Sequence, residues 1–123
     1  MKTSRRILFV ENDEDFRLSY SEFLEKEGYL VVNCKNSNDC KQAIEERLEW
    51  DIAIVDKGLD MRGWDDGGEL IRYLHELKNG SPIIAISGDE NYRLTPGATI
   101  LLMKPFSPDK LVDEIKKFDY LFS

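Results

Sequence analysis

Cysteine and histidine are scarce in this sequence, and that scarcity excludes several kinds of site. Only two cysteines, Cys34 and Cys40, and one histidine, His75, occur among its 123 residues. Two cysteines cannot form the disulfide framework of a small secreted domain, and their spacing does not match a CxxC motif. We therefore expect two buried, reduced thiols in a cytoplasmic protein, and no metal site at His75.

Long hydrophobic runs and clusters of positive charge are missing too. Every apolar run is far shorter than the roughly 20 residues that a membrane-spanning helix needs. The N-terminal residues MKTSRR lead directly into such a run, so we expect neither a signal peptide nor a membrane anchor. The 24 acidic residues outnumber the 17 basic ones, and the net charge is −7. Because nucleic-acid binding requires clustered positive charge, we expect no direct contact with nucleic acid.

The sequence does contain a regular alternation of short apolar runs and segments with helical periodicity. Five apolar runs predict β-strands: ILFV (7–10), YLVVN (29–33), IAIV (52–55), PIIAI (82–86) and ILLM (100–103). This alternation is typical of a parallel α/β sheet, here in one domain spanning residues 1–123. The segment GDENYRLTPGAT (88–99) has too few apolar positions to predict a full amphipathic helix.

Residues with special backbone roles mark the ends of the predicted helices. Gly28 is a natural stop for the first helix. Ser37 or Asn38 is the expected N-cap of the second helix. Ser107 followed by Pro108 predicts the start of the last one, because proline is favoured at the first helical position.

Four of the apolar runs end on polar residues: Glu11 with Asn12 and Asp13, then Asp56, Ser87 and Lys104. The carboxyl ends of parallel strands meet at one edge of a sheet, where such sheets bind their ligands. Alone, each residue has a plainer explanation as a turn residue or as an acid that complements a helix dipole. Their convergence instead favours a site for a divalent metal and a phosphoryl group.

The chemistry of these residues suits phosphoryl transfer. A carboxylate held rigidly at the end of a buried strand, as expected of Asp56, can act as a nucleophile and form an acyl phosphate. Glu11 and its neighbours offer the oxygen ligands that Mg²⁺ prefers. Lys104 would place a positive charge against the phosphoryl oxygens, and the Ser87 hydroxyl could donate a hydrogen bond to one of them.

The sequence resembles the receiver domains of two-component response regulators. Five stretches carry the resemblance, in the family's order: RILFVENDEDF, DIAIVD, DGGELIRYL, SPIIAISG and MKPFSPDKLVDEI. The resemblance implies a flavodoxin-like, doubly wound sheet of five parallel strands in the order 2-1-3-4-5. It also implies that Asp56 accepts a phosphoryl group from a sensor histidine kinase or a histidine phosphotransfer protein.

The resemblance assigns further roles. Mg²⁺ would be bound by the side chains of Glu11, Asn12 and Asp56 and by the backbone carbonyl of Gly58. Ser87 and Lys104 would stabilise the phosphoryl group, and the bond between Lys104 and Pro105 would be cis.

Two segments depart from the family's pattern: residues 11–13, which we call the acidic corner, and the loop after Asp56. Asn12 stands where the family has a second acid, so metal affinity should be lower, and the adjacent Asp13 is a possible substitute ligand. The loop KGLDMRGWDDGG (57–68) is longer than usual. Three roles are open for its Trp64: covering the site, forming a contact surface, or packing on the domain.

The switch region departs as well. Ser87 and Leu101 occupy the family's two switch positions, and Leu101 replaces an aromatic residue. The span from Ser87 to Lys104 is shorter than usual, and Pro96 and Gly97 restrict helix formation there. We therefore expect a shortened fourth helix and an altered output surface.

These observations favour a phosphorylation-controlled signalling domain that is not an enzyme and whose output is unassigned. The alternative is a receiver-like protein-interaction module that does not depend on phosphorylation. A magnesium-dependent phosphatase using Asp56 is less favoured, because no second acid–base motif accompanies that residue. A flavin carrier is disfavoured because the loop after the first strand is acidic rather than a phosphate cradle. The sequence leaves open whether an output domain follows residue 123.

Overall fold

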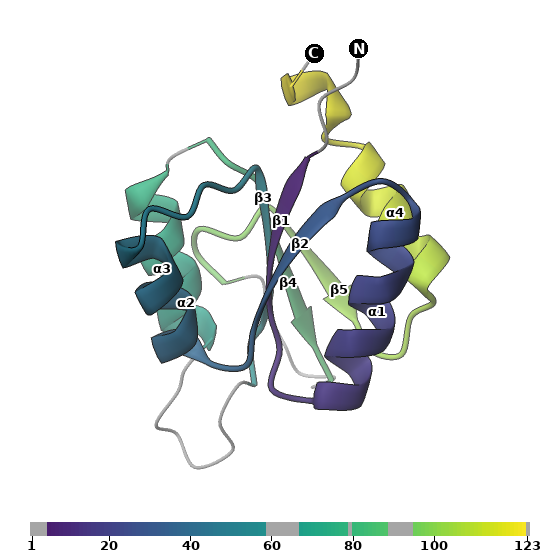
Figure 1. The fold of residues 1–123 in the computed structure, drawn as a ribbon, viewed down its shortest axis with the longest axis horizontal. Helices are drawn as coiled ribbons and strands as arrows, with labels where there is room; N and C mark the ends of the chain where they lie inside the picture. The colour runs from purple at the N-terminus through teal and green to yellow at the C-terminus, as the bar shows by residue number, and fades with distance from the viewer. Residues whose placement is uncertain (1–4, 59–66, 79, 89–94, 123) are drawn as a thin grey trace.

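The computed structural model describes residues 5–58, 67–78, 80–88 and 95–122. Strands and helices alternate through this part of the chain (Figure 1). In order they are β1 (Arg6–Val10), α1 (Glu14–Lys26), β2 (Leu30–Cys34), α2 (Ser37–Glu45), β3 (Ile52–Asp56), α3 (Gly67–Leu77), β4 (Ile83–Ser87), β5 (Ile100–Met103) and α4 (Pro108–Lys116), followed by a 3₁₀ turn, η1 (Asp119–Phe122). No helix among these residues is long and apolar enough to cross a membrane.

The five strands form one parallel sheet in the order β2-β1-β3-β4-β5, which confirms the predicted fold. Asp56 is the last residue of β3 and pairs with Ile86, and Ser87 ends β4 opposite Met103. Both functional candidates are therefore the last residues of their strands rather than the first residues of loops. The carboxyl ends of the strands form the lower edge of the sheet in Figure 1.

Helices cover both faces of the sheet. α1 and α4 lie on one side, and α2 and α3 lie on the other (Figure 1). In β1, Ile7 and Phe9 belong to the core cluster on the α1/α4 side, whereas Leu8 and Val10 belong to the cluster on the α2/α3 side. This alternation follows from the two-residue period of a strand. All residues of β3 and β4 are buried, as expected of central strands covered on both faces.

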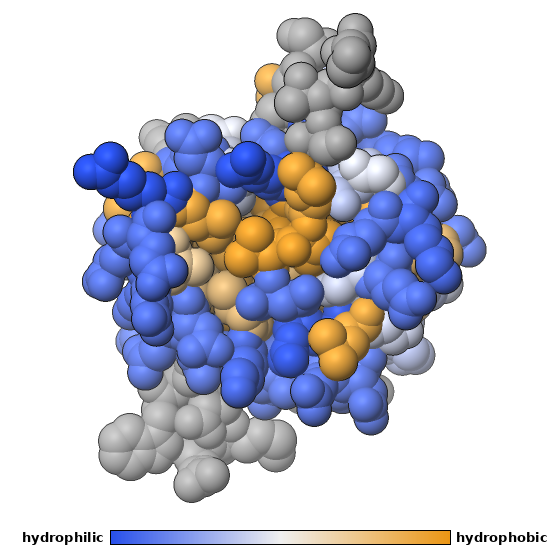
Figure 2. Space-filling model, viewed as in Figure 1, coloured by the Kyte–Doolittle hydropathy of each residue, from blue (hydrophilic) through white to orange (hydrophobic). Residues whose placement is uncertain are grey.

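Strand β2 lies at the edge of the sheet and is less well covered. Its Leu30 is 51% exposed, and the next two residues are partly buried. Apolar surface gathers in the middle of the view in Figure 2, where Figure 1 places β2 and β1 between the polar helices. The edge strand therefore contributes apolar side chains to the surface.

The N-cap of α2 differs from the prediction. Neither Ser37 nor Asn38 caps this helix; the cap is Asn36, whose side chain accepts a hydrogen bond of 2.8 Å from the amide of Asp39. The backbone of Asn36 is extended, and Ser37 is already the first helical residue. The helix therefore begins one residue earlier than a cap at Ser37 would give and two residues earlier than a cap at Asn38 would give.

The other predicted helix ends are confirmed. Ser107 caps α4 by accepting a hydrogen bond from the amide of Lys110, and Pro108 is the first helical residue. Gly28 follows the end of α1 with φ of +98°, a left-handed conformation that glycine adopts at little cost.

The connection from β4 to β5 contains no helix among its described residues, Gly88 and 95–99. Residues 89–94, on which part of the expected short helix would fall, lie outside the described part of the chain. Gly97 has φ of +95°, and a Cβ atom there would lie 3.1 Å from Cβ of His75. This connection therefore packs tightly against α3.

Candidate functional site

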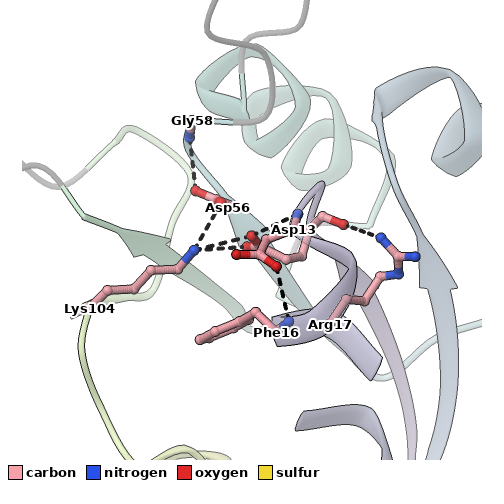
Figure 3. A network of polar contacts seen from close by, with 7 residues as sticks. Asp13, Phe16, Arg17, Asp56, Gly58 and Lys104 are labelled. Carbon is pink, nitrogen blue, oxygen red and sulfur yellow. Dashed lines mark hydrogen bonds and ion pairs between the residues drawn. The ribbon is translucent and has the colours of Figure 1, made fainter. Parts of the chain in front are cut away.

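Three charged side chains meet at the carboxyl edge of the sheet. The ammonium of Lys104 lies 3.1 and 3.3 Å from the two carboxylate oxygens of Glu11 and 3.2 Å from Oδ2 of Asp56 (Figure 3). Glu11 follows β1, Asp56 ends β3 and Lys104 follows β5, so the fold brings together three predicted site residues from distant parts of the chain. Lys104 is joined to Pro105 by a cis peptide bond, as the resemblance implied.

Burial shifts the pKa values of the charged side chains in this cluster. Glu11 is fully buried and Asp56 is 6% exposed. Burial and the neighbouring Asp56 carboxyl raise the pKa of Glu11 to about 8, and Lys104 opposes that shift only in part. Burial lowers the pKa of Lys104, but the two carboxylates outweigh this effect and leave it raised. The Lys104 ammonium alone therefore does not bring the pKa of Glu11 back to its ordinary value.

The backbone around Asp56 fixes its carboxylate. Oδ1 accepts a hydrogen bond of 2.9 Å from the amide of Gly58, while Oδ2 faces Lys104. The amide of Lys57 continues the sheet ladder by donating to the carbonyl of Ile86 at 2.9 Å. The carboxylate therefore has a defined orientation at the end of a rigid strand.

Helix α3 begins directly against the backbone of Asp56. A Cβ atom on Gly67 would lie 2.2 Å from the carbonyl oxygen of Asp56 and 2.6 Å from Cα of Lys57, so only glycine fits there. The sequence analysis missed this role. The doublet Gly67-Gly68 at the start of a helix was the available signal, because glycine is otherwise unfavourable in a helix.

The corner between β1 and α1 is held by Arg17, another residue that the sequence analysis missed. Its guanidinium is buried and donates a hydrogen bond of 2.7 Å to the carbonyl of Glu11. The amide of Asp13 donates to Oε1 of Glu11 at 3.2 Å. Glu11 is thus fixed through both its carbonyl and its side chain. A single arginine in a highly charged helix gave no sequence signal of burial.

Asn12 and Asp13, the two remaining candidates of the acidic corner, are exposed. The side chain of Asp13 caps α1 by accepting a hydrogen bond of 3.1 Å from the amide of Phe16. In this arrangement the Asp13 carboxylate faces the helix rather than Asp56.

The two candidate switch residues lie in different surroundings. Ser87 is buried at the end of β4, and its carbonyl accepts a hydrogen bond of 2.8 Å from the amide of Lys104. Leu101 is partly buried and packs against the cluster on the α2/α3 side. Trp64 lies outside the residues that the structure describes.

An aromatic cluster adjoins the charged site on the α1/α4 side. The Lys104 ammonium lies 4.5 Å from the centroid of the Phe16 ring, within the range of a cation–π interaction. Phe16 stacks on Tyr20 with centroids 4.0 Å apart, and the Tyr20 hydroxyl donates a hydrogen bond to the carbonyl of Phe106. We call Phe16, Tyr20 and Phe106 the aromatic cluster. It connects Lys104 with α1 and with the loop before α4.

The donor set suits a hard divalent cation. Mg²⁺ in proteins commonly takes one or two carboxylates, retains several waters and prefers oxygen ligands. Glu11 and Asp56 provide two neighbouring carboxylates whose mutual repulsion a cation would relieve. The described residues hold no group of three or more Asp, Glu, His or Cys side chains arranged for a metal. A complete set would therefore need the Asn12 amide, the Gly58 carbonyl or waters.

Comparison with known proteins agrees with this geometry. The family model of the response regulator receiver domain matches residues 7–116. The chain is 31% identical to the response regulator receiver protein CpdR of Brucella abortus over 122 residues, covering 92% of this chain and 95% of CpdR. It is 35% identical to the transcriptional regulatory protein GltR of Pseudomonas aeruginosa over 119 residues, covering 91% of this chain but only 48% of GltR. The chain thus spans about half the length of GltR and nearly all of CpdR.

Solved structures show the same relationship. A CheY-like receiver domain protein from Methanospirillum hungatei superposes with a TM-score of 0.81 at 28% identity, covering 94% of this chain and 93% of that one. The receiver domain of NtrX from Brucella abortus gives a TM-score of 0.79 at 25% identity, covering 90% and 95% of the two chains. With the match of the family model over most of its length, this chain belongs to the receiver domains of two-component response regulators.

Proposed function

We propose that this domain is a phosphoacceptor that takes a phosphoryl group on Asp56 from a sensor histidine kinase or a histidine phosphotransfer protein. The observation that carries the proposal is the contact of Lys104 with both Glu11 and Asp56 at the carboxyl edge of the sheet. The Asp56 carboxylate is fixed through the Gly58 amide, so one oxygen is oriented while the other faces the cation. Transfer itself depends mainly on positioning and charge neutralisation.

In this proposal each residue of the site has its own role. Asp56 is the nucleophile. Lys104 balances the charge of the new phosphoryl oxygens, and the Ser87 hydroxyl donates a hydrogen bond to one of them. Glu11, Asn12, Asp56 and the Gly58 carbonyl hold Mg²⁺, which when bound neutralises negative charge as the phosphoryl group approaches. Asn12 supplies no charge, so the affinity for Mg²⁺ is lower than with a second carboxylate, and Asp13 is the nearest substitute.

The site acts as a signalling switch rather than as a turnover enzyme. Phosphorylation of Asp56 changes the charge beside Lys104 and shifts a two-state equilibrium in the surrounding loops. We further propose a cytoplasmic location, where a kinase would reach the domain. Several relatives, GltR among them, are named transcriptional regulatory proteins, so control of transcription through another part of a longer chain is one output.

Phosphorylation can be tested with acetyl phosphate and Mg²⁺. Intact-mass spectrometry should show one base-labile phosphoryl adduct on the wild-type chain and none on Asp56→Ala. Asp51→Ala is a matched control, because Asp51 accepts a backbone hydrogen bond at the opposite end of β1. An adduct that persists in Asp56→Ala would contradict the proposal.

The second candidate is a protein-interaction module that does not depend on phosphorylation. The exposed Asn12 and the inward-packed Leu101 favour it, because both alter positions that carry metal binding and switching in the family. Titration with Mg²⁺ separates the two candidates. Binding at millimolar concentration that is lost in Asp56→Ala supports the phosphoacceptor, and no binding in either protein supports the interaction module.

A further inference from the structure

The two cysteines form a buried pair close to the acidic corner, and neither has a part in the proposed phosphoryl transfer. Cys34 is the last residue of β2 and is 3% exposed, and Cys40 lies in α2 and is fully buried. Both belong to the core cluster on the α2/α3 side. A side-chain hydrogen bond with Cys40 lowers the pKa of the Cys34 thiol, and burial opposes this shift. The two residues are free thiols, and this hydrogen bond places their side chains next to each other.

We propose that Cys34 and Cys40 are a reversible oxidation site, which hydrogen peroxide converts to an intramolecular disulfide. The chemistry needs no further reactant. The Cys34 sulfur attacks the peroxide, an S–O bond forms as the O–O bond breaks, and one water leaves. The Cys40 sulfur then attacks Cys34, an S–S bond forms as the S–O bond breaks, and a second water leaves. Two thiols are oxidised by two electrons, and one peroxide is reduced to two waters.

The placement of Cys34 explains how an oxidant reaches it. β2 is an edge strand of the sheet, and Asn33 and Lys35 on either side of Cys34 are exposed. Local opening at the end of an edge strand is a small event compared with global unfolding. Burial excludes bulky thiols such as glutathione, and the contact with Cys40 favours an internal disulfide over a link between two chains.

The oxidation site is connected to the acidic corner through the backbone. Cys34 pairs with Val10 in the sheet, and its carbonyl accepts a hydrogen bond of 3.0 Å from the amide of Glu11. A disulfide requires the two sulfurs to approach to about 2.05 Å. This movement draws the end of β2 toward α2, so it changes the environment of the Glu11 amide.

Peptide mapping of the complete wild-type chain tests the site directly. The protein is treated with hydrogen peroxide under native conditions, remaining thiols are alkylated, and the sample is digested with trypsin. Cleavage after Lys35 separates the cysteines into the peptides EGYLVVNCK (27–35) and NSNDCK (36–41). We expect these two peptides to be joined as the major cysteine product and to separate after reduction with dithiothreitol.

Several results would overturn the proposal. The first is that both thiols stay unmodified at a peroxide dose that oxidises Met103, which is 37% exposed. The second is sulfinic acid at Cys34 as the main product, and the third is disulfide-linked dimers. Met103 thus reports in every sample that the oxidant was delivered. The wild-type mapping is decisive by itself, and Cys40→Ser serves as a matched variant in which Cys34 should form no linked peptide.

A second measurement tests the connection to Glu11 and does not depend on phosphorylation. In ¹⁵N-resolved NMR spectra, the amide resonance of Glu11 should shift on oxidation and return on reduction. The amide of Phe118, which donates to the carbonyl of Ile115 far from both cysteines, should stay in place. An unchanged Glu11 resonance in a protein whose disulfide is confirmed would refute the connection to the acidic corner.

Discussion

The two faces of the sheet contact the charged site in different ways. On the α1/α4 side the contact is made by side chains, through the Lys104 ammonium against the Phe16 ring. On the α2/α3 side it is made by backbone, through Gly67 of α3 against the carbonyl oxygen of Asp56. A backbone contact fixes position, whereas a side-chain contact can change rotamer as charge changes. The α2/α3 side therefore holds Asp56 in place. On the α1/α4 side Arg17 holds the carbonyl of Glu11, while the contact of Phe16 with Lys104 is free to respond to a change of charge.

Leu101 lies on the side of the sheet away from the aromatic cluster. Leu101 packs with the core cluster on the α2/α3 side. Its side chain has no polar group that could bind Lys104. The aromatic cluster lies on the other face and touches Lys104 directly. We therefore expect a change in the position of Lys104 to affect α1 and the loop preceding α4 first. The connection between β4 and β5 should be affected later.

The largest effect on stability is expected at the contact between Gly67 and the backbone of Asp56. Gly67→Ala places a Cβ atom 2.2 Å from the Asp56 carbonyl oxygen, so α3 must move or β3 must distort. The free energy of unfolding should fall by about 3 kcal/mol or more, as measured by urea denaturation. Gly58→Ala is the control, because among the described residues the Cβ atom would come near Oδ1 of Asp56 alone, at 3.8 Å. Equal stabilities of the two variants would show that α3 does not rest on β3 as described.

The next effect concerns pH. The folded-state pKa of Glu11 is about 8 against an ordinary value of 4.5, so the folded protein binds more protons than the unfolded chain between these values. The stabilisation is complete below about pH 4.5 and is lost as the pH rises toward 8. Denaturation in EDTA from pH 5 to 8 measures this fall. Glu11→Gln should flatten the dependence, and a wild-type curve that rises with pH would contradict it.

A smaller effect on stability is expected on the α1/α4 side of the sheet. Phe16→Leu keeps an apolar side chain but removes the ring beside Lys104, which should cost about 2 kcal/mol of stability. It should also weaken binding of beryllofluoride, a phosphoryl analogue, in a fluorescence titration. Leu101→Val disturbs packing on the opposite face and should leave that affinity unchanged. If Leu101→Val alters the affinity more than Phe16→Leu does, the assignment of the two faces is reversed.

The smallest effect is expected within the aromatic cluster. Tyr20→Phe preserves the stacking on Phe16 and removes only the hydrogen bond to the Phe106 carbonyl. Thermal denaturation should show a loss of about 1 kcal/mol. Tyr73→Phe is the control, because the contact of Tyr73 with the Lys41 ammonium uses the ring face and survives the change. Comparable losses in both variants would mean that the hydroxyl of Tyr20 adds nothing.

Much of the fold could be predicted from the sequence because strand positions depend on local apolar runs. The convergence of Glu11, Asp56 and Lys104 followed from the parallel arrangement alone. Strand ends were less predictable: β3 and β4 extend to Asp56 and Ser87, since the amides of Lys57 and Lys104 continue the hydrogen-bond ladder. Polar residues at a buried strand end look like loop residues to any hydropathy pattern.

The residues that the sequence analysis missed act through contacts with distant parts of the chain. Arg17 is buried because the Glu11 carbonyl accepts its hydrogen bond, and Gly67 is required because β3 passes beside it. Asn36 caps α2 in place of Ser37 or Asn38 because a cap depends on backbone conformation, which all three side chains suit equally well. The roles assigned to Asn12 and Asp13 in metal binding remain predictions.

The separation of Lys104 from its partners along the chain has a consequence for synthesis. Lys104 is 93 positions from Glu11 and 48 positions from Asp56. While the ribosome is still adding β5, the growing chain already contains both carboxyl groups but not the cation that pairs with them. In the phosphoacceptor role that we propose, a partly made chain therefore lacks the cation that would balance the phosphoryl oxygens on Asp56 until the residues after the last strand have been added.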